Sequence, residues 1–479
     1  MKKLLQYLGN YKKESILGPL FKLLEASFEL IVPLVMAAII DTGVANADRP
    51  YIMKMSLVLF LLALIGLTCA ITAQYFAAKA AVGCATGLRH ALFEHIETLS
   101  FTEMDTVGTS TLITRMTSDV NQVQNGVNLV LRLFLRSPFI VFGAMVMAFT
   151  IDVKAALVFV VTIPLLSVVV FGIMLVSIPL YKKVQAALDK VLGITRENLT
   201  GSRVIRAFNK EQDEIAQFHE DNEALTKIQL YVGKISALMN PLTYIIINGA
   251  IVVLVWVGAI RVDNGNITQG QVVALVSYMS QILVELIKLA NLIININKSI
   301  ACMNRIETVL DMESSITEHP AAETGSLTSD GAGREGKETI PAENAVVFSK
   351  VGLTYAGASE EALSDIDFTV RRGETIGIIG GTGSGKSSVV NLIPRFYDAT
   401  RGEVLVDGKN VRDYTLEELR AKVGVVLQKA VLFKGTIREN LSWGNSDATD
   451  EEMYEALETA QAREFVDAKE GGLSYEIEQ

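Results

Sequence analysis

Cysteine is scarce in this sequence, and the spacing of the few cysteines excludes two kinds of site. The chain has 479 residues and only three cysteines, Cys69, Cys84 and Cys302. No two of them have the spacing of zinc ligands, and an odd number without a cluster does not form a disulfide framework. We therefore interpret them as small apolar residues in a reducing or membrane setting.

Positive charge is also in short supply. The formal net charge is −10, and only 20% of the residues are charged. A protein whose main partner is nucleic acid needs a basic face toward the phosphate backbone, so we predict no nucleic-acid partner. Half of the residues are apolar, a high share for a soluble globular protein.

Several long windows contain no charge at all, among them Met55–Ala78, Ala155–Tyr181 and Ile235–Ile260. Windows of about twenty apolar residues or more are long enough to cross the hydrocarbon core as helices, and they exceed the length typical of a buried helix in a soluble core. We therefore predict an all-α membrane domain over residues 1–313. Its six spans are expected at about 16–40, 55–78, 133–151, 155–181, 235–260 and 264–296.

The connections between the spans alternate between short and long. Residues 79–132 and 182–234 are long, polar and helical in pattern, which predicts extensions that project well beyond the bilayer. Positive charges gather in the second extension: Lys182, Lys183, Lys190, Arg196, Arg203, Arg206 and Lys210. The positive-inside rule then places both extensions and both termini in the cytoplasm.

The composition changes after residue 313. Residues 314–344 are rich in Ser, Thr, Gly, Glu and Ala without an apolar period, which predicts a flexible linker. Residues 345–479 have the pattern of a soluble α/β domain. The expected strands include "AVVFSKVGLTY", "IDFTV", "ETIGIIG", "GEVLVDG" and "VGVVLQ". Two helices are expected after Thr415 and Thr449, each with a glutamate at capping-box spacing.

The most specific motif lies at residues 380–387 and matches G-x-x-x-x-G-K-[ST]. Its residues are Gly380, Gly381, Thr382, Gly383, Ser384, Gly385, Lys386 and Ser387. Glycines let backbone N–H groups turn toward phosphate oxygens, and an apolar strand before the loop with a helix after it is the expected context. A chance glycine turn is the alternative, and the complete match argues against it.

This motif predicts distinct roles for its side chains. Lys386 is expected to reach the β- and γ-phosphates of a nucleotide, and Ser387 is expected to bind Mg²⁺. Ser388 and Gly383 are expected to add hydroxyl or backbone contacts. The helix that begins near Lys386 also directs its positive end toward the same anion.

Six spans with long helical extensions, a linker and this phosphate-binding loop resemble a bacterial ABC exporter half-transporter of the multidrug or lipid type. The resemblance covers the whole chain and implies ATP and Mg²⁺ as cofactors. It implies that Tyr355 stacks on adenine and that Gln428 contacts Mg²⁺ and the attacking water. It also implies that the segments Thr109–Val120 and Glu197–Glu211 form the tips that press short coupling helices into the nucleotide-binding domains.

Each of these three features has an ordinary alternative. A tyrosine at a strand end commonly packs without a ligand, and a glutamine at a strand end is commonly solvated. The two tips would also be consistent with solvated helix–loop–helix connections.

The resemblance implies a dimer with an identical or similar half-transporter. In such a dimer, two ATP molecules close the nucleotide-binding domains, and alternating access exports a small or amphipathic solute, drug-like or lipid, across the bacterial cytoplasmic membrane. An alternative from another class is a membrane subunit that binds ATP without hydrolysing it, as a regulator or a degenerate half. An ABC importer is a third possibility, but its membrane and nucleotide-binding parts are usually separate chains.

The sequence departs from the family pattern near its end. The signature motif, the Walker B aspartate, the catalytic glutamate and the switch histidine do not occur before Gln479. We expect a fragment of a longer reading frame rather than a degenerate half. The 479-residue chain is therefore predicted to be inactive alone, although the complete chain is predicted to be an ABC-type ATPase coupled to transport.

Charged residues occur inside two expected spans. Lys22, Glu25 and Glu29 share one face of the first span, and Glu285 and Lys288 are three apart in the sixth. One interpretation is that Glu25, Glu29 and Glu285 line a path for cationic amphiphiles. The favoured interpretation is structural, with Lys22 paired to Glu25 or Glu29 and Glu285 paired to Lys288.

Overall fold

The computed structural model describes residues 2–317 and 343–478. Most of the expected linker, residues 318–342, therefore lies outside the described residues. Contacts divide the chain into two compact units. The first comprises Met1–Leu99 and Glu103–Ser314, and the second comprises Ser100–Thr102 and Ser315–Gln479.

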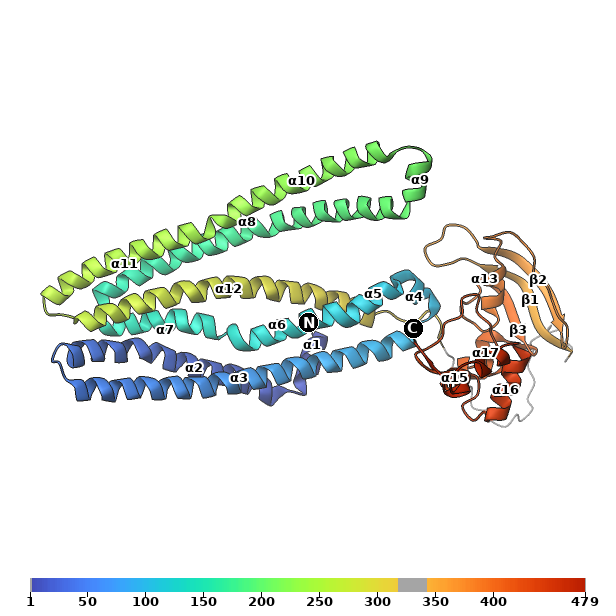
Figure 1. Cartoon of the computed structure of the whole chain (residues 1–479), viewed down its shortest axis with the longest axis horizontal. Coiled ribbons are helices and arrows are strands. Elements are labelled where there is room, and N and C mark those ends of the chain that lie inside the picture. Colours follow the sequence, from blue (N-terminus) through green and yellow to red (C-terminus); the bar gives the residue numbers. More distant parts are fainter. Residues whose placement is uncertain (1, 318–342, 479) are drawn as a thin grey trace, which may run out of the picture. The chain divides into compact units, whose positions relative to one another are not determined.

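The described part of the first unit consists of helices and short connections (Figure 1). Its α-helices are α1 (Lys2–Gly9), α2 (Lys12–Ala38), α3 (Arg49–Thr98), α4 (Phe101–Val107), α5 (Thr109–Thr114), α6 (Val120–Leu133), α7 (Arg136–Ile151), α8 (Val153–Thr200), α9 (Ser202–Ala207), α10 (Glu211–Ala237), α11 (Met239–Asp263) and α12 (Gln269–Leu310). Two π-helical segments, η1 (Ile39–Val44) and η2 (Arg115–Asp119), continue α2 and precede α6.

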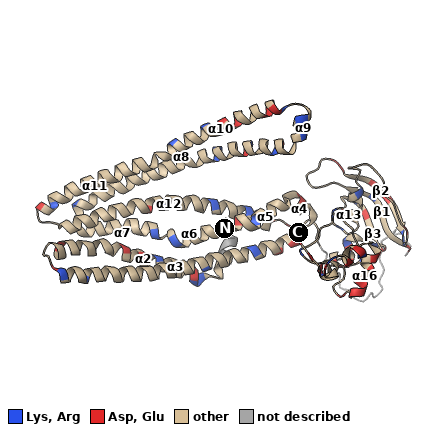
Figure 2. Cartoon of the chain, viewed as in Figure 1, with Lys and Arg blue, Asp and Glu red and all other residues tan. Residues whose placement is uncertain are grey.

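Six helical stretches of this unit are long and apolar enough to cross a membrane. They are Lys12–Val44, Arg49–Thr98, Thr109–Ile151, Val153–Thr200, Glu211–Asp263 and Gln269–Leu310. At about 1.5 Å per residue a helix as long as α3 measures roughly 75 Å, against about 30 Å for the hydrocarbon core. The predicted helical extensions are therefore confirmed. Figure 2 shows long uncharged stretches on α7, α11 and α12, whereas charges gather on α9 and α10.

The two extensions turn at different places relative to the predicted tips. The first turns at α4, ahead of the expected segment Thr109–Val120, which instead forms α5, η2 and the start of α6. Leu99 has an extended backbone that ends α3, and Gly108 adopts a φ of +80° that ends α4. The second extension turns at α9, which lies inside the expected segment Glu197–Glu211.

Close helix packing in this unit depends on small residues. A Cβ at Gly126 of α6 would lie 2.2 Å from the Ser299 hydroxyl of α12. A Cβ at Gly143 of α7 would lie 2.4 Å from Leu30 Cδ1 of α2. Without an apolar driving force between helices in lipid, such close contacts and hydrogen bonds hold the bundle together.

The second unit contains a four-stranded antiparallel sheet in the order β2-β1-β3-β4 and a two-stranded ribbon, β5-β6. The strands are β1 (Asn344–Leu353), β2 (Leu363–Arg371), β3 (Arg401–Val406), β4 (Lys409–Asn410), β5 (Gly435–Thr436) and β6 (Glu476–Ile477). The α-helices are α13 (Lys386–Leu392), α14 (Leu416–Lys422), α15 (Ile437–Leu441), α16 (Asp450–Thr459) and α17 (Arg463–Asp467), with short 3₁₀ turns η3 (Val411–Asp413) and η4 (Gly472–Ser474). The predicted fold class, helical membrane domain followed by an α/β domain, is confirmed.

The predicted capping boxes are also confirmed. Thr415 accepts from the backbone N–H of Glu418 at the start of α14, and the glutamate side chain accepts from the Thr415 N–H. The same reciprocal pair joins Thr449 and Glu452 at the start of α16. Each pair satisfies two backbone donors that the first helical turn leaves without partners.

Two predicted strands are wrong as strands. The segments 375–379 and 423–427 form no strand and pair with no other strand among the described residues. Ile379 is 97% exposed and Val426 is fully exposed. A strand forms only where a neighbouring segment supplies backbone hydrogen bonds. Both sides of β1 are already paired, with β2 and β3. An apolar sequence pattern does not show whether such a neighbour is available.

Candidate functional site: a glycine loop and a charged cluster

The glycine loop runs from the end of β2 to the start of α13. Gly383 and Gly385 adopt φ values of +83° and +84°, a left-handed backbone conformation that residues with a Cβ rarely adopt. A Cβ at residue 385 would also lie 2.6 Å from Leu363 Cδ2 and 3.2 Å from the Ala362 carbonyl oxygen. Both the backbone and the space therefore require glycine at this position.

The Lys386 ammonium lies against the backbone of this loop. Its Nζ donates to the carbonyl oxygens of Gly380 at 2.9 Å and Gly381 at 2.7 Å, and to the Ser384 hydroxyl at 3.3 Å. The loop thus holds a positive charge at its centre, where the motif is expected to take phosphate oxygens. Thr382 and Ser387 have exposed side chains at the same loop and are accessible to a ligand.

Tyr355 joins this loop from the end of β1. Its hydroxyl donates to the Ser388 hydroxyl of α13 at 2.8 Å, and its ring packs edge-on against Tyr397 with centroids 5.1 Å apart. Together these contacts hold an aromatic ring next to the glycine loop. Gln428 is exposed, and no hydrogen bond connects it to the loop among the described residues.

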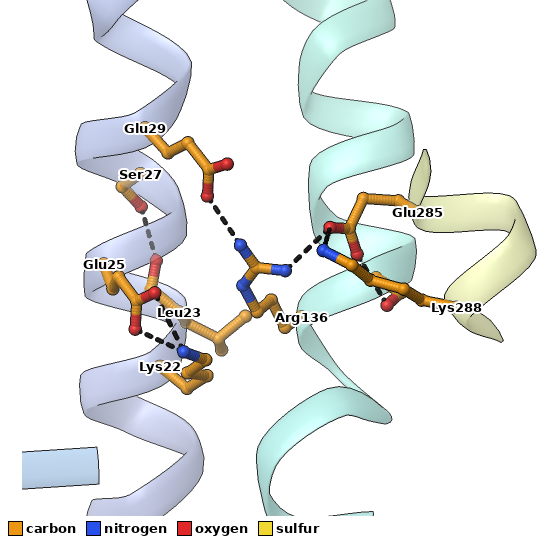
Figure 3. A network of polar contacts seen from close by, with 9 residues as sticks. Lys22, Leu23, Glu25, Ser27, Glu29, Arg136, Glu285 and Lys288 are labelled. Atoms are coloured by element: carbon orange, nitrogen blue, oxygen red, sulfur yellow. Dashed lines mark hydrogen bonds and ion pairs between the residues drawn. The ribbon is translucent and has the colours of Figure 1, made fainter. Parts of the chain in front are cut away.

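A second cluster of functional character lies inside the first unit, where α2, α7 and α12 meet (Figure 3). The Arg136 guanidinium of α7 donates from Nη2 to Glu29 at 2.6 Å and from Nη1 to Glu285 at 2.7 Å. Ser137 donates its hydroxyl to the other oxygen of Glu285 at 2.8 Å. Lys288 donates to Glu285 at 2.9 Å.

The remaining pair of the cluster is local to α2, where Lys22 donates to both Glu25 carboxylate oxygens, at 2.8 and 2.6 Å. The predicted pairs Lys22–Glu25 and Glu285–Lys288 are therefore confirmed. The cluster also contains Arg136, whose role the sequence did not suggest because its partners are 107 and 149 residues away. Three carboxylates face three cations, so the structure favours the structural interpretation over a path with excess negative charge.

Family models match both parts of the chain. Residues 15–286 match the ABC transporter transmembrane region, and residues 363–476 match the ABC transporter family. An uncharacterized ABC transporter ATP-binding protein of Mycobacterium tuberculosis is 34% identical over 96% of this chain and 78% of its own length.

Two further relatives have more specific names. A putative multidrug export ATP-binding/permease protein of Bacillus subtilis is 32% identical over 97% of this chain and 79% of its own length. An ATP-dependent lipid A-core flippase of Desulfotalea psychrophila is 30% identical over 80% of this chain and 64% of its own length. Fusion of the two matched regions in one chain is the arrangement of a half-transporter. This chain is therefore a multi-pass membrane protein that belongs to the ABC transporter family.

Proposed function

We propose that this protein is one half of an ATP-driven exporter that moves an amphipathic solute, drug-like or lipid, across the bacterial cytoplasmic membrane. The observation that carries the proposal is the lysine-centred glycine loop in the same chain as six apolar helices long enough to span a bilayer. The names of the relatives from B. subtilis and D. psychrophila support export of drugs or lipids as the cargo class.

Each residue of the proposed nucleotide site has a role. Backbone N–H groups of residues 380–385 surround the phosphates, and Lys386 exchanges its carbonyl partners for β- and γ-phosphate oxygens. Ser387 supplies a hydroxyl to Mg²⁺, Gln428 supplies the second protein oxygen, and Ser388 supports the loop. Tyr355 offers its ring to adenine, and its hydrogen bond to Ser388 supports that placement.

The same proposal gives the arrangement in the membrane. Residues 1–313 form the membrane domain, 314–344 the linker, and 345–479 the nucleotide-binding part. The basic side chains that gather on α8, on α9 and at Lys210 just before α10 favour a cytoplasmic position for the extensions, both termini and the nucleotide site. A second half-transporter, identical or similar, completes the pump, which switches between inward- and outward-facing states.

Nucleotide binding is tested with the membrane-reconstituted protein and trinitrophenyl-ATP in the presence of Mg²⁺. Changing Lys386→Ala is expected to weaken binding at least about tenfold, because the loop loses the cation that meets the phosphates. Lys434→Ala, an exposed lysine outside the loop, is the matched control and is expected to bind like the parent. Equal affinity of the Lys386 variant and the parent would contradict the proposed site.

Export is tested separately with the complete chain in proteoliposomes that contain a fluorescent phospholipid and a cationic dye. Mg-ATP is expected to drive movement of at least one of these probes, and Lys386→Ala is expected to abolish the movement. The alternative, a subunit that binds ATP without hydrolysing it, predicts nucleotide binding with neither phosphate release nor probe movement. That outcome would retain the nucleotide site and overturn the export proposal.

A further inference from the structure

The third membrane-spanning stretch, Thr109–Ile151, is not one regular helix. Its helical hydrogen bonding is interrupted between α6, which ends at Leu133, and α7, which begins at Arg136, although Phe134 and Leu135 keep right-handed helical dihedrals. Pro138 explains the position of the break. Proline has no N–H to donate to the carbonyl four residues earlier, at Phe134, and its ring clashes with that carbonyl, although it fits well in the first turn of a new helix.

A break of this kind would let the two segments of the span bend independently, unless other contacts hold them. Contacts on the α6 side include two with α12: the Ser299 hydroxyl donates to the Gln122 carbonyl at 2.8 Å, and Arg305 Nε donates to Asp119 of η2 at 3.0 Å. Arg89 of α3 also donates to Asn121 of α6, at 2.6 Å. Contacts on the α7 side begin with its first residue, Arg136. The polar contacts therefore flank the break on both sides.

Arg136 is suited to hold the α7 side. Its side chain is 8% exposed, and its two terminal nitrogens donate to carboxylates on two different helices, Glu29 of α2 and Glu285 of α12 (Figure 3). The planar guanidinium presents its donors in one rigid fork, so the two bonds also orient the first turn of α7. Ser137 adds a further bond from the next residue to Glu285.

We propose that Arg136 is a positioning residue that acts as the pin of a joint: by binding Glu29 and Glu285 at once, it keeps α6 and α7 at a constant angle across the proline break. Motion that reaches α6 from η2 and α5 then passes to α7 instead of being lost as bending at Phe134–Leu135. The joint follows from the contacts alone, and its use in transport rests on the proposed function.

The two arms of the joint differ in strength. The Glu285 side chain is 4% exposed and accepts from Arg136, Ser137 and Lys288. The Glu29 side chain is 40% exposed and accepts from Arg136 alone among the described contacts. Glu29 is therefore the arm whose removal leaves the buried Arg136 still paired with Glu285.

The joint is tested by the distance between two nitroxide labels, one on each side of the break. Exposed positions for the labels are Asn125 of α6 and Val146 of α7, each changed to cysteine after the buried native cysteines are changed to alanine. Double electron–electron resonance then gives the distribution of distances between the two labels in the intact reconstituted protein. We expect a narrow distribution in this parent and a roughly twofold broader one in Arg136→Gln, because the break becomes free to bend.

Two further variants distinguish the joint from a general effect on folding. Glu29→Ala removes only the exposed arm, acceptor oxygens included, and is expected to broaden the distribution. Glu25→Ala, the same truncation one turn earlier on α2 at a residue whose partner Lys22 is on the same helix, is the matched control and is expected to leave it narrow. Broadening in the control to the same extent as in Glu29→Ala would overturn the joint.

A variant that removes the proline break provides the decisive test. Pro138→Ala restores the backbone donor for Phe134 and is expected to make the span continuous. In the background of Arg136→Gln it is expected to return the distribution to the parent width, since a continuous helix needs no pin. A distribution that stays broad in this double variant, or that is never broadened by Arg136→Gln, rules the proposal out. These results do not depend on nucleotide or cargo, so failure of the joint is distinct from failure of the exporter proposal.

Discussion

The Tyr355 hydroxyl donates to the Ser388 hydroxyl over 2.8 Å, which ties the end of β1 to the first turn of α13. The bond connects the residue proposed to stack on the base with a residue proposed to support the phosphate-binding loop. The Tyr397 ring supports Tyr355 from the side, at a near-perpendicular interplanar angle of 89°. The position of the aromatic ring is therefore coupled to the position of the glycine loop.

This coupling predicts different results for two changes at Tyr355. Tyr355→Ala removes the stacking surface and is expected to weaken trinitrophenyl-ATP binding about tenfold, since stacking of a base on an aromatic side chain is worth about 1–3 kcal/mol. Tyr355→Phe keeps the ring, loses only the bond to Ser388, and is expected to bind within about fivefold of the parent, since one net hydrogen bond is worth about 1 kcal/mol. Equal affinities for the alanine variant and the parent would remove Tyr355 from the site.

The glycine loop yields a prediction about stability. Gly385→Ala places a Cβ against Leu363 and the Ala362 carbonyl in a left-handed conformation, and is expected to destabilise the second unit by about 2 kcal/mol. Gly381→Ala is the control, because a Cβ there meets no atom within 4 Å. Thermal unfolding of the intact protein in detergent measures both. A midpoint for the Gly385 variant equal to that of the Gly381 variant would contradict the geometry.

Packing of α6 on α12 yields another prediction about stability. Gly126→Ala gains about 1 kcal/mol of helix propensity but brings its Cβ to 2.2 Å from Ser299 Oγ and 2.4 Å from Ser299 Cβ. Overpacking of this kind costs about 1–3 kcal/mol, so the net effect is expected to be destabilising. The same change is expected to be stabilising or neutral in a Ser299→Gly background, where the obstructing side chain is absent. A double-mutant cycle of thermal midpoints without coupling would disprove this contact.

The ion pair between Arg438 and Asp450 predicts a dependence on pH. Arg438 Nη2 donates to Asp450 at 2.8 Å, and this hydrogen bond holds the pKa of the Asp450 carboxyl below its ordinary value. Because the folded pKa is lower than the unfolded one, the pair stabilises the second unit at neutral pH, and the contribution is lost as pH falls below about 4. Asp450→Asn is expected to reduce the loss of stability between neutral and acidic pH.

Salt provides the control for the same pair. Both side chains are partly exposed, at 40% and 52%, so the difference between Asp450→Asn and the parent is expected to shrink in concentrated salt. Acid titrations of the parent and variant, each followed by circular dichroism at low and high salt, measure this difference in stability. Parallel titration curves for the two proteins at low salt would show that the pair does not contribute.

Local signals in the sequence predicted much of the fold. Charge-free windows indicated the spans, since the cost of burying charge in lipid acts on each segment by itself. Capping boxes at Thr415 and Thr449 were predictable because both partners lie within one helical turn. The loop around Lys386 was identifiable because its glycines and lysine are contiguous.

Pairing between distant segments was the part that local patterns did not predict. The apolar segments 375–379 and 423–427 have strand-like composition, but composition does not specify a neighbouring strand. The partners of Arg136 are on helices that only the folded bundle brings together. Pro138 lies inside the apolar window 133–151, which was interpreted as a span without a break.

The contacts of Lys386 bear on how a binding measurement on this loop is interpreted. Its ammonium already satisfies two backbone carbonyls, at 2.9 and 2.7 Å, so arrival of a phosphate is a substitution of one set of oxygens for another. The heat released on binding should accordingly be smaller than a tally of new lysine–phosphate bonds suggests, because the old ones are given up in the same step. Calorimetric comparison of the parent with Lys386→Ala would report the difference between two occupied states of one cation, not the full strength of its bond to the nucleotide.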